Sequence, residues 1–197
     1  VVCLSPTLQH TLRFIELKKG SVNRASHYHV SAGGKGINVA RNLAQLAQPA
    51  QLLTLLGGHT GEIVKECLNV ENISYQTVPT DSNTRICMTL LESGQSTTEI
   101  VEESEPVTDL QVQETEQLFK SMLPKSNFVI LSGTVPNGYP ETIYKLMVDL
   151  SFKSEIPVLI DGCGQLLRFA LVAKPYIVKP NKEELEKTFN RKIKSHT

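Results

Sequence analysis

The sequence has no excess of charge of either sign, because 20 lysine and arginine residues balance 20 aspartate and glutamate residues in 197. Nucleic acids and anionic membranes bind basic surfaces, so neither is expected as the main partner. No apolar run is long enough to cross a bilayer, and no signal peptide opens the chain. We therefore expect a soluble, cytoplasmic protein that binds no nucleic acid and no membrane.

Cysteine is scarce, and its spacing argues against metal and redox motifs. The four cysteines are far apart and form no Cys-x-x-Cys pair, which indicates reduced thiols. His27 and His29 would share one face of a strand, but no third metal ligand accompanies them. We interpret that face as solvated.

Short apolar runs that stop at glycine indicate a parallel sheet. Residues 51–56, 128–131 and 158–160 are such runs, and each is followed by glycine within two residues. Helix-period segments alternate with them, and one begins at a capping box from Thr108 to Gln111. This alternation predicts an α/β fold with a mostly parallel sheet covered by helices on both faces.

Strand-like pieces interrupt this series. They comprise residues 11–17, 26–31, 75–78, 85–91 and 97–101, with a hairpin turn predicted at residues 92–95. We expect them to form a small β-sheet lid over the main domain, inserted near residues 11–31 and 75–101.

The most informative segment is a glycine loop, Ala32-Gly-Gly-Lys-Gly-Ile-Asn-Val-Ala-Arg41. Its glycines let the backbone approach a ligand closely, and the helix that follows offers free N–H groups. Lys35 adds a charge, and Asn38 can donate to and accept from sugar hydroxyls. A tight turn with an exposed lysine explains the same residues, so the loop alone leaves both interpretations open. It is neither a Walker A loop nor Gly-x-Gly-x-x-Gly, which argues against a Rossmann-type nucleotide binder.

Other segments accompany the loop in a fixed order. They are Ser21-Val-Asn-Arg-Ala25 before it, then Gly57-Gly58 with Gly61, Thr84-Arg85-Ile86, Leu131-Ser-Gly-Thr134 and Val178-Lys-Pro-Asn-Lys-Glu-Glu184. Together they resemble the PfkB/ribokinase superfamily of sugar kinases, best the branch with 1-phosphofructokinase and tagatose-6-phosphate kinase. The resemblance covers essentially the whole chain. It implies a ribokinase-like three-layer αβα domain, with a β-lid through which two copies form a homodimer. It also implies ATP and Mg²⁺ as cofactors and a sugar phosphate as acceptor.

The resemblance also implies which residues bind the acceptor. Gly33, Gly34 and Asn38 match sugar-holding positions, and Ser132 lies in a matching segment. Three basic residues match positions used for the phosphate that the acceptor already carries, namely Arg24, Lys35 and Arg85. A dianion binds best to several cationic donors, and arginine can hold it with two hydrogen bonds. For Arg24 or Arg85 alone, a solvated lid charge is the competing interpretation.

On the nucleotide side, Asn181 and Glu184 match the family's Asn-x-x-Glu motif, which orders Mg²⁺ and phosphate through water. Lys179 would flank the nucleotide. An asparagine followed three residues later by glutamate is also an ordinary helix start, and both interpretations can hold together.

The sequence departs from the family pattern in two ways. Gln9 stands where the branch has an aspartate that binds sugar hydroxyls, and an amide has no charge, which leaves the sugar's identity open. The Gly-Ala-Gly-Asp motif, which supplies the catalytic base and an anion hole in relatives, does not occur, and Asp161 lacks that context. We therefore expect residues 1–197 to form a partial kinase domain whose C-terminal third is absent, with no catalytic residue among them.

Two functions remain open on the sequence alone. The complete polypeptide would phosphorylate a hydroxyl of a sugar phosphate with ATP. Alternatively, the chain is a catalytically inactive fragment that binds a sugar phosphate or dimerises, and it would bind ligand without turnover.

Overall fold

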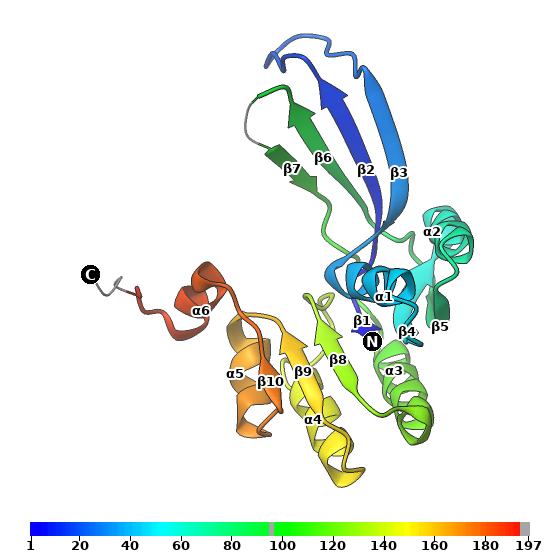
Figure 1. The fold of residues 1–197 in the computed structure, drawn as a ribbon, viewed down its shortest axis with the longest axis vertical. Coiled ribbons are helices and arrows are strands. Elements are labelled where there is room, and N and C mark those ends of the chain that lie inside the picture. Colours follow the sequence, from blue (N-terminus) through cyan, green and yellow to red (C-terminus); the bar gives the residue numbers. More distant parts are fainter. Residues whose placement is uncertain (95–96, 194–197) are drawn as a thin grey trace.

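The protein has two sheets, and the computed structural model describes residues 1–94 and 97–193 (Figure 1). The larger sheet has six strands in the order β10-β9-β8-β1-β4-β5, and every pairing in it is parallel. The smaller sheet has four strands in the order β3-β2-β6-β7 and stands away from the larger one as a lid. The predicted α/β fold with a separate small sheet is confirmed.

Strands and helices alternate along the chain. The main sheet contains β1 (Val2–Cys3), β4 (Gln51–Gly57), β5 (Ser74–Thr80), β8 (Val129–Ser132), β9 (Val158–Asp161) and β10 (Ile177–Val178). The helices are α1 (Lys35–Gln45), α2 (Gly58–Val70), α3 (Asp109–Met122), α4 (Ile143–Lys153), α5 (Gly164–Val172) and α6 (Lys182–Phe189), with a 3₁₀ turn at Leu123–Lys125. Within the described residues, no helix has the length and apolarity needed to cross a membrane.

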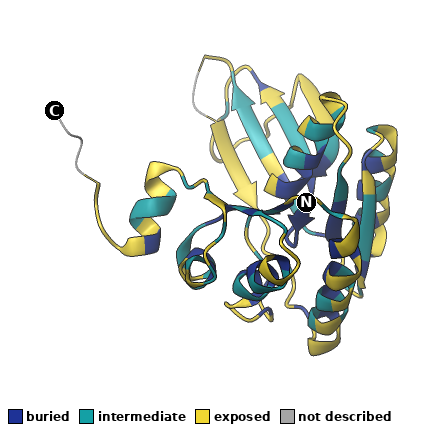
Figure 2. Cartoon of the chain, turned by 60° about the horizontal axis from the view of Figure 1, so that its bottom comes forward, coloured by how far each residue is buried: buried dark blue, intermediate teal, exposed yellow. Residues whose placement is uncertain are grey.

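The core lies on both faces of the main sheet, as the alternation along β4 shows. Leu53 and Leu55 pack in the cluster built with α3, α4 and α5. Leu52 and Leu56 pack in the cluster built with α1 and α2. A strand that is buried on both faces is apolar at successive positions, which is why this run could be recognised in the sequence. Figure 2 shows the chain coloured by burial, with buried residues in dark blue.

The lid is a mixed sheet of β2 (Thr7–Phe14), β3 (His27–Gly33), β6 (Ile86–Glu92) and β7 (Thr97–Val101). β2 is its centre, antiparallel to β3 and parallel to β6. The chain passes between the sheets from β1 to β2, β3 to α1, β5 to β6 and β7 to α3. The hairpin turn predicted at residues 92–95 includes residue 95, which lies outside the described residues.

The placement of residues 75–78 in the lid is wrong. They belong to β5, which pairs with β4 at the edge of the main sheet from Gln51 opposite Ser74 to Gly57 opposite Thr80. β5 is mostly polar, and only Val78 in it is buried. An edge strand of this kind lacks the continuous apolar run that marks an inner parallel strand, and its sequence therefore resembles that of a lid strand.

Candidate active site

The glycine loop joins the lid to the main sheet. β3 ends at Gly33 and α1 begins at Lys35, with Gly34 between them at φ +116°, a conformation that favours glycine. A Cβ atom on Gly36 would lie 2.5 Å from the Cβ of Cys3 in β1, so only glycine lets the first turn of α1 pack this closely. The N-terminus of α1, with its free N–H groups, is thereby held at the carboxyl end of β1.

A cavity of about 650 Å³ opens between this loop and the lid. Five of the predicted acceptor residues line it: Gln9, Gly34, Lys35, Asn38 and Arg85. Its wall also includes Ser5, Thr7, Cys87, Thr89, Glu99, Glu103, Ser104, Gly133, Thr134 and Asn137. Residues from both sheets, polar and apolar, therefore form one space at the carboxyl ends of the parallel strands, where ligands of α/β proteins bind.

Three other predicted residues lie outside the wall of this cavity. Gly33 is buried directly behind it, where a Cβ atom would lie 2.8 Å from Cγ2 of Thr7. Ser132 is buried at the end of β8, and its hydroxyl lies 3.4 Å from Oδ2 of Asp161. Arg24 is exposed in the connection between β2 and β3, at the far end of the lid, and the structure does not bring it to the cavity (Figure 1).

Arg85 is held by two of the segments that connect the lid to the main sheet. Its guanidinium donates to the carbonyls of Pro6, Glu102 and Ser5 at 3.3, 3.0 and 3.4 Å. These carbonyls belong to the β1–β2 and β7–α3 connections, so one side chain holds two connecting segments together. A guanidinium has five N–H groups, and those not engaged here remain for a ligand in the cavity.

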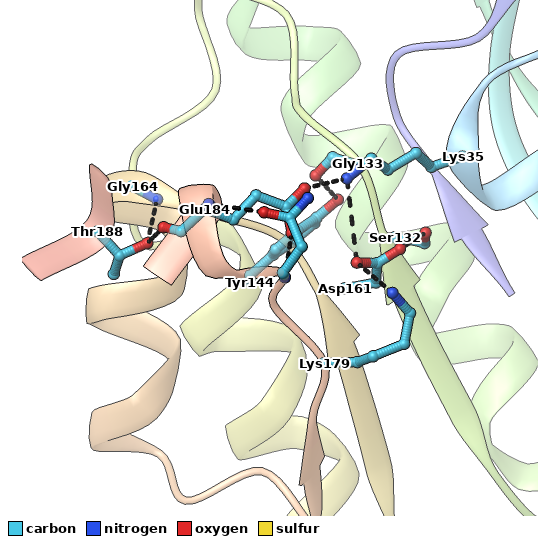
Figure 3. A network of polar contacts seen from close by, with 10 residues as sticks. Lys35, Ser132, Gly133, Tyr144, Asp161, Gly164, Lys179, Glu184 and Thr188 are labelled. Carbon is cyan, nitrogen blue, oxygen red and sulfur yellow. Dashed lines mark hydrogen bonds and ion pairs between the residues drawn. The ribbon is translucent and has the colours of Figure 1, made fainter. Parts of the chain in front are cut away.

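Lys35 connects this cavity to the predicted nucleotide side (Figure 3). Its ammonium contacts Oε1 of Glu184 at 2.5 Å and lies 4.0 Å from Oδ1 of Asp161. Lys179 approaches the same Asp161 oxygen at 3.4 Å. Two lysines and two carboxylates thus form one charged cluster beside the cavity. They come from α1, from the ends of β9 and β10, and from α6.

The electrostatics of this cluster favour its ionised state. The hydrogen bond from Lys35 and then the backbone N–H of Asn181 lower the pKa of Glu184. Burial by itself would lower the pKa of Lys35, but the hydrogen bond to Glu184 and the charges of Asp161 and Glu184 raise it above its ordinary value. At neutral pH both partners are therefore charged.

The start of α6 is a capping box, as the sequence predicted. Asn181 Oδ1 accepts from the N–H of Glu184 at 2.8 Å, and Glu184 Oε2 accepts from the N–H of Asn181 at 2.9 Å. Glu184 therefore caps the helix with one oxygen and pairs with Lys35 through the other.

The hydroxyl of Thr188 accepts a hydrogen bond from the N–H of Gly164 at 2.9 Å, which ties α6 to α5.

Asp161 was not among the site residues predicted from the sequence. It is buried at the end of β9, and its Oδ1 makes no hydrogen bond in the described part of the chain, although the ammonium groups of Lys179 and Lys35 lie 3.4 and 4.0 Å from it. Both Asp161 and Glu184 lie within 4.0 Å of the Lys35 ammonium. A carboxylate at the end of a buried strand was the signal that could have identified it.

Comparison with known proteins places the chain in a family. The family model described as pfkB family carbohydrate kinase matches residues 2–197. The chain belongs to the pfkB family. The structure of a tetrameric inhibited form of Escherichia coli phosphofructokinase-2 matches with a TM-score of 0.88 and 25% identity, over 98% of this chain and 64% of that one. A Thermotoga maritima protein described as a possible 1-phosphofructokinase matches with a TM-score of 0.87 and 27% identity, over 92% and 59%.

The pfkB chain thus spans about three fifths of the length of these solved phosphofructokinases. Its membership confirms the family resemblance found in the sequence, and the matched range includes both the glycine loop and the Asn-x-x-Glu segment.

Proposed function

We propose that the complete protein transfers the γ-phosphoryl group of ATP to a hydroxyl of a sugar phosphate, in the manner of a 1-phosphofructokinase or tagatose-6-phosphate kinase. The observation that carries the proposal is the single cavity that contains Gln9, Asn38, Lys35 and Arg85 and meets Glu184 through Lys35. Amides and cations suit the two parts of a sugar phosphate, its hydroxyls and its dianion. E. coli phosphofructokinase-2 has also been solved with fructose 6-phosphate.

The nucleotide and Mg²⁺ would lie on the α6 side of the cluster. Mg²⁺ in kinases is held by one or two carboxylates together with phosphate oxygens and water. Asp161 and Glu184 would supply these carboxylates. Both lie within 4.0 Å of the Lys35 ammonium, and Asp161 Oδ1 is buried with no hydrogen bond in the described residues, facing the ammonium groups of Lys179 and Lys35. Bound Mg²⁺ would neutralise phosphate charge during transfer. Lys179 and Lys35 would add positive charge on either side of Asp161.

Removal of Arg85 tests the acceptor assignment. Arg85→Ala deletes charge-assisted hydrogen bonds worth about 1.5–3 kcal/mol, so the KM for the phosphorylated sugar should rise roughly 10- to 150-fold. Steady-state kinetics with MgATP and fructose 1-phosphate, fructose 6-phosphate or tagatose 6-phosphate measures this. Unphosphorylated fructose is the control, because its weaker reaction should not depend on Arg85. An unchanged KM for every sugar phosphate would remove Arg85 from the site.

We further propose that the lid joins two copies of the chain. The register of the lid strands places Tyr28 on β3, Met88 on β6 and Ile100 on β7 on one face of the lid, and their exposed fractions are 79%, 36% and 51%. Apolar side chains gathered on an exposed sheet are typical of an interface. Light scattering of the purified protein should give twice the mass of one chain, and a monomer at micromolar concentration would contradict this assembly.

A further inference from the structure

Arg41, the last residue of the glycine-loop motif, reaches back toward the cavity. It lies on α1, and Glu71 at the end of α2 holds its guanidinium with two hydrogen bonds, 2.5 Å from Nε and 3.0 Å from one terminal nitrogen. The guanidinium then donates to Oδ1 of Asn38 at 2.6 Å and to the carbonyl of Ala32 at 2.5 Å. Arg41 itself does not line the acceptor cavity, whereas Asn38 does.

This contact determines which end of the Asn38 amide remains free. A guanidinium only donates hydrogen bonds, so the Asn38 atom that faces it must be the carbonyl oxygen. The atom left for a ligand is therefore Nδ2, which only donates. Without Arg41, the amide could rotate and present either atom, because its oxygen and nitrogen ends have nearly the same shape.

Gln9 on the lid is fixed in the opposite sense. Its Nε2 lies 3.3 Å from the carbonyl of His10 and 3.0 Å from the hydroxyl of Thr89. A backbone carbonyl only accepts hydrogen bonds, so the Gln9 atom that faces it must be the nitrogen. Oε1 remains available, and it is an acceptor like the carboxylate oxygen that the family resemblance implies at this position.

We infer that Arg41 and the His10 carbonyl fix the amides of Asn38 and Gln9 in opposite orientations, so that the cavity offers the sugar one hydrogen-bond donor and one acceptor. The inference rests on the proposed acceptor site and adds which of its two amides donates a hydrogen bond to the sugar and which accepts one. A suitable ligand is a polyol phosphate with one hydroxyl that donates to Gln9 and one oxygen that accepts from Asn38. Arg41 is then a positioning residue, which acts through Asn38 without touching the sugar.

A double-mutant cycle separates this role from a structural one. The variants are Arg41→Ala, Asn38→Ala and the double substitution, with Lys145→Ala on the surface of α4 as the control. The sugar is whichever of fructose 1-phosphate, fructose 6-phosphate and tagatose 6-phosphate the unaltered protein uses best. Arg41→Ala should raise the KM for this sugar roughly three- to tenfold, as expected for a misdirected hydrogen bond, and leave the KM for ATP unchanged. In the Asn38→Ala background it should have no further effect.

The outcomes are distinct. An equal rise in KM in both backgrounds, or no rise in either, overturns the inference while the proposed function stands. If the unaltered protein neither phosphorylates nor binds any of the three sugars, the acceptor site and the inference built on it both fall.

A second variant keeps the test decisive if Arg41→Ala does not fold. Asn38→Asp preserves the contact with Arg41 but cannot donate to the sugar, so its KM should rise about tenfold or more. A KM equal to that of the unaltered protein would overturn the inference.

Discussion

The ion pair between Lys35 and Glu184 links residues 149 positions apart and should couple the glycine loop to α6. We would replace Lys35 by methionine and Glu184 by glutamine, singly and together. Glutamine is accepted at this position of a capping box, so Glu184→Gln removes the charge and keeps the helix cap. The double-mutant cycle then reports the interaction between the two charges alone.

The expected coupling energy follows from the exposure of the two side chains. Two unit charges about 4 Å apart attract by about 4 kcal/mol at an effective dielectric constant near 20. Lys35 is half exposed, so solvent and salt screen most of this attraction, and pairs in fully exposed positions give only about 0.2–1 kcal/mol. Glu184 is less exposed than its partner, which places the expected coupling near 1 kcal/mol at low salt.

Urea unfolding at several pH values measures this contribution. The lowered pKa of Glu184 means that its stabilisation is complete above the ordinary value of 4.5 and is lost as the pH falls through the folded-state pKa. The raised pKa of Lys35 means that its stabilisation is complete below 10.5 and is lost as the pH rises through its folded-state pKa. The coupling should therefore be largest between about pH 5 and pH 10.

The Lys65–Glu62 pair, three residues apart on α2, provides the control. Its carboxylate is 64% exposed, against 16% for Glu184, and its expected coupling is below about 0.5 kcal/mol. A Lys35–Glu184 coupling no larger than this control, and the same at pH 3 and pH 7, would refute the ion pair as a link between the loop and α6.

Two further predictions concern Gln9 in the cavity and Gly36 in the glycine loop. Gln9→Asp should change the relative kcat/KM values for the three sugar phosphates, since it replaces a neutral amide by a charged carboxylate; an identical substrate profile would mean that Gln9 does not contact the sugar. Gly36→Ala should lower the free energy of unfolding by about 2 kcal/mol or more, because its Cβ would overlap Cys3. Gly162→Ala, whose Cβ would meet nothing closer than 3.7 Å, is the matched control, and equal losses in the two variants would refute the packing argument.

The sequence predicted those parts of the fold whose signals are local. β4, β8 and β9 are apolar because both of their faces are buried, and the capping boxes at Thr108 and Asn181 are set by residues three positions apart. The edge strand β5 was misplaced because a half-exposed strand carries no such run. The local sequence thus predicted where helices and strands lie better than it predicted which strands pair with one another.

The candidate site was predictable as a set of residues but not as a network. Lys35 was expected to face the acceptor phosphate, and nothing near it in the sequence indicated Glu184 as its partner. Arg41 stood within the recognised motif, yet only the approach of α2 shows that it orients Asn38. Contacts between distant segments depend on how helices pack on the sheet, which residue spacing does not reveal.

The order of strands in the lid has a consequence for how the protein folds. β2 and β3 form one antiparallel pair and β6 and β7 another, and each pair joins strands that are near in sequence. The parallel pairing of β2 with β6, which sets Leu8 opposite Ile86, must close a much longer loop. We therefore expect the two hairpins to form early and to join late. Because Gln9 belongs to one hairpin and Thr89 to the other, the acceptor cavity would be completed only in that last step.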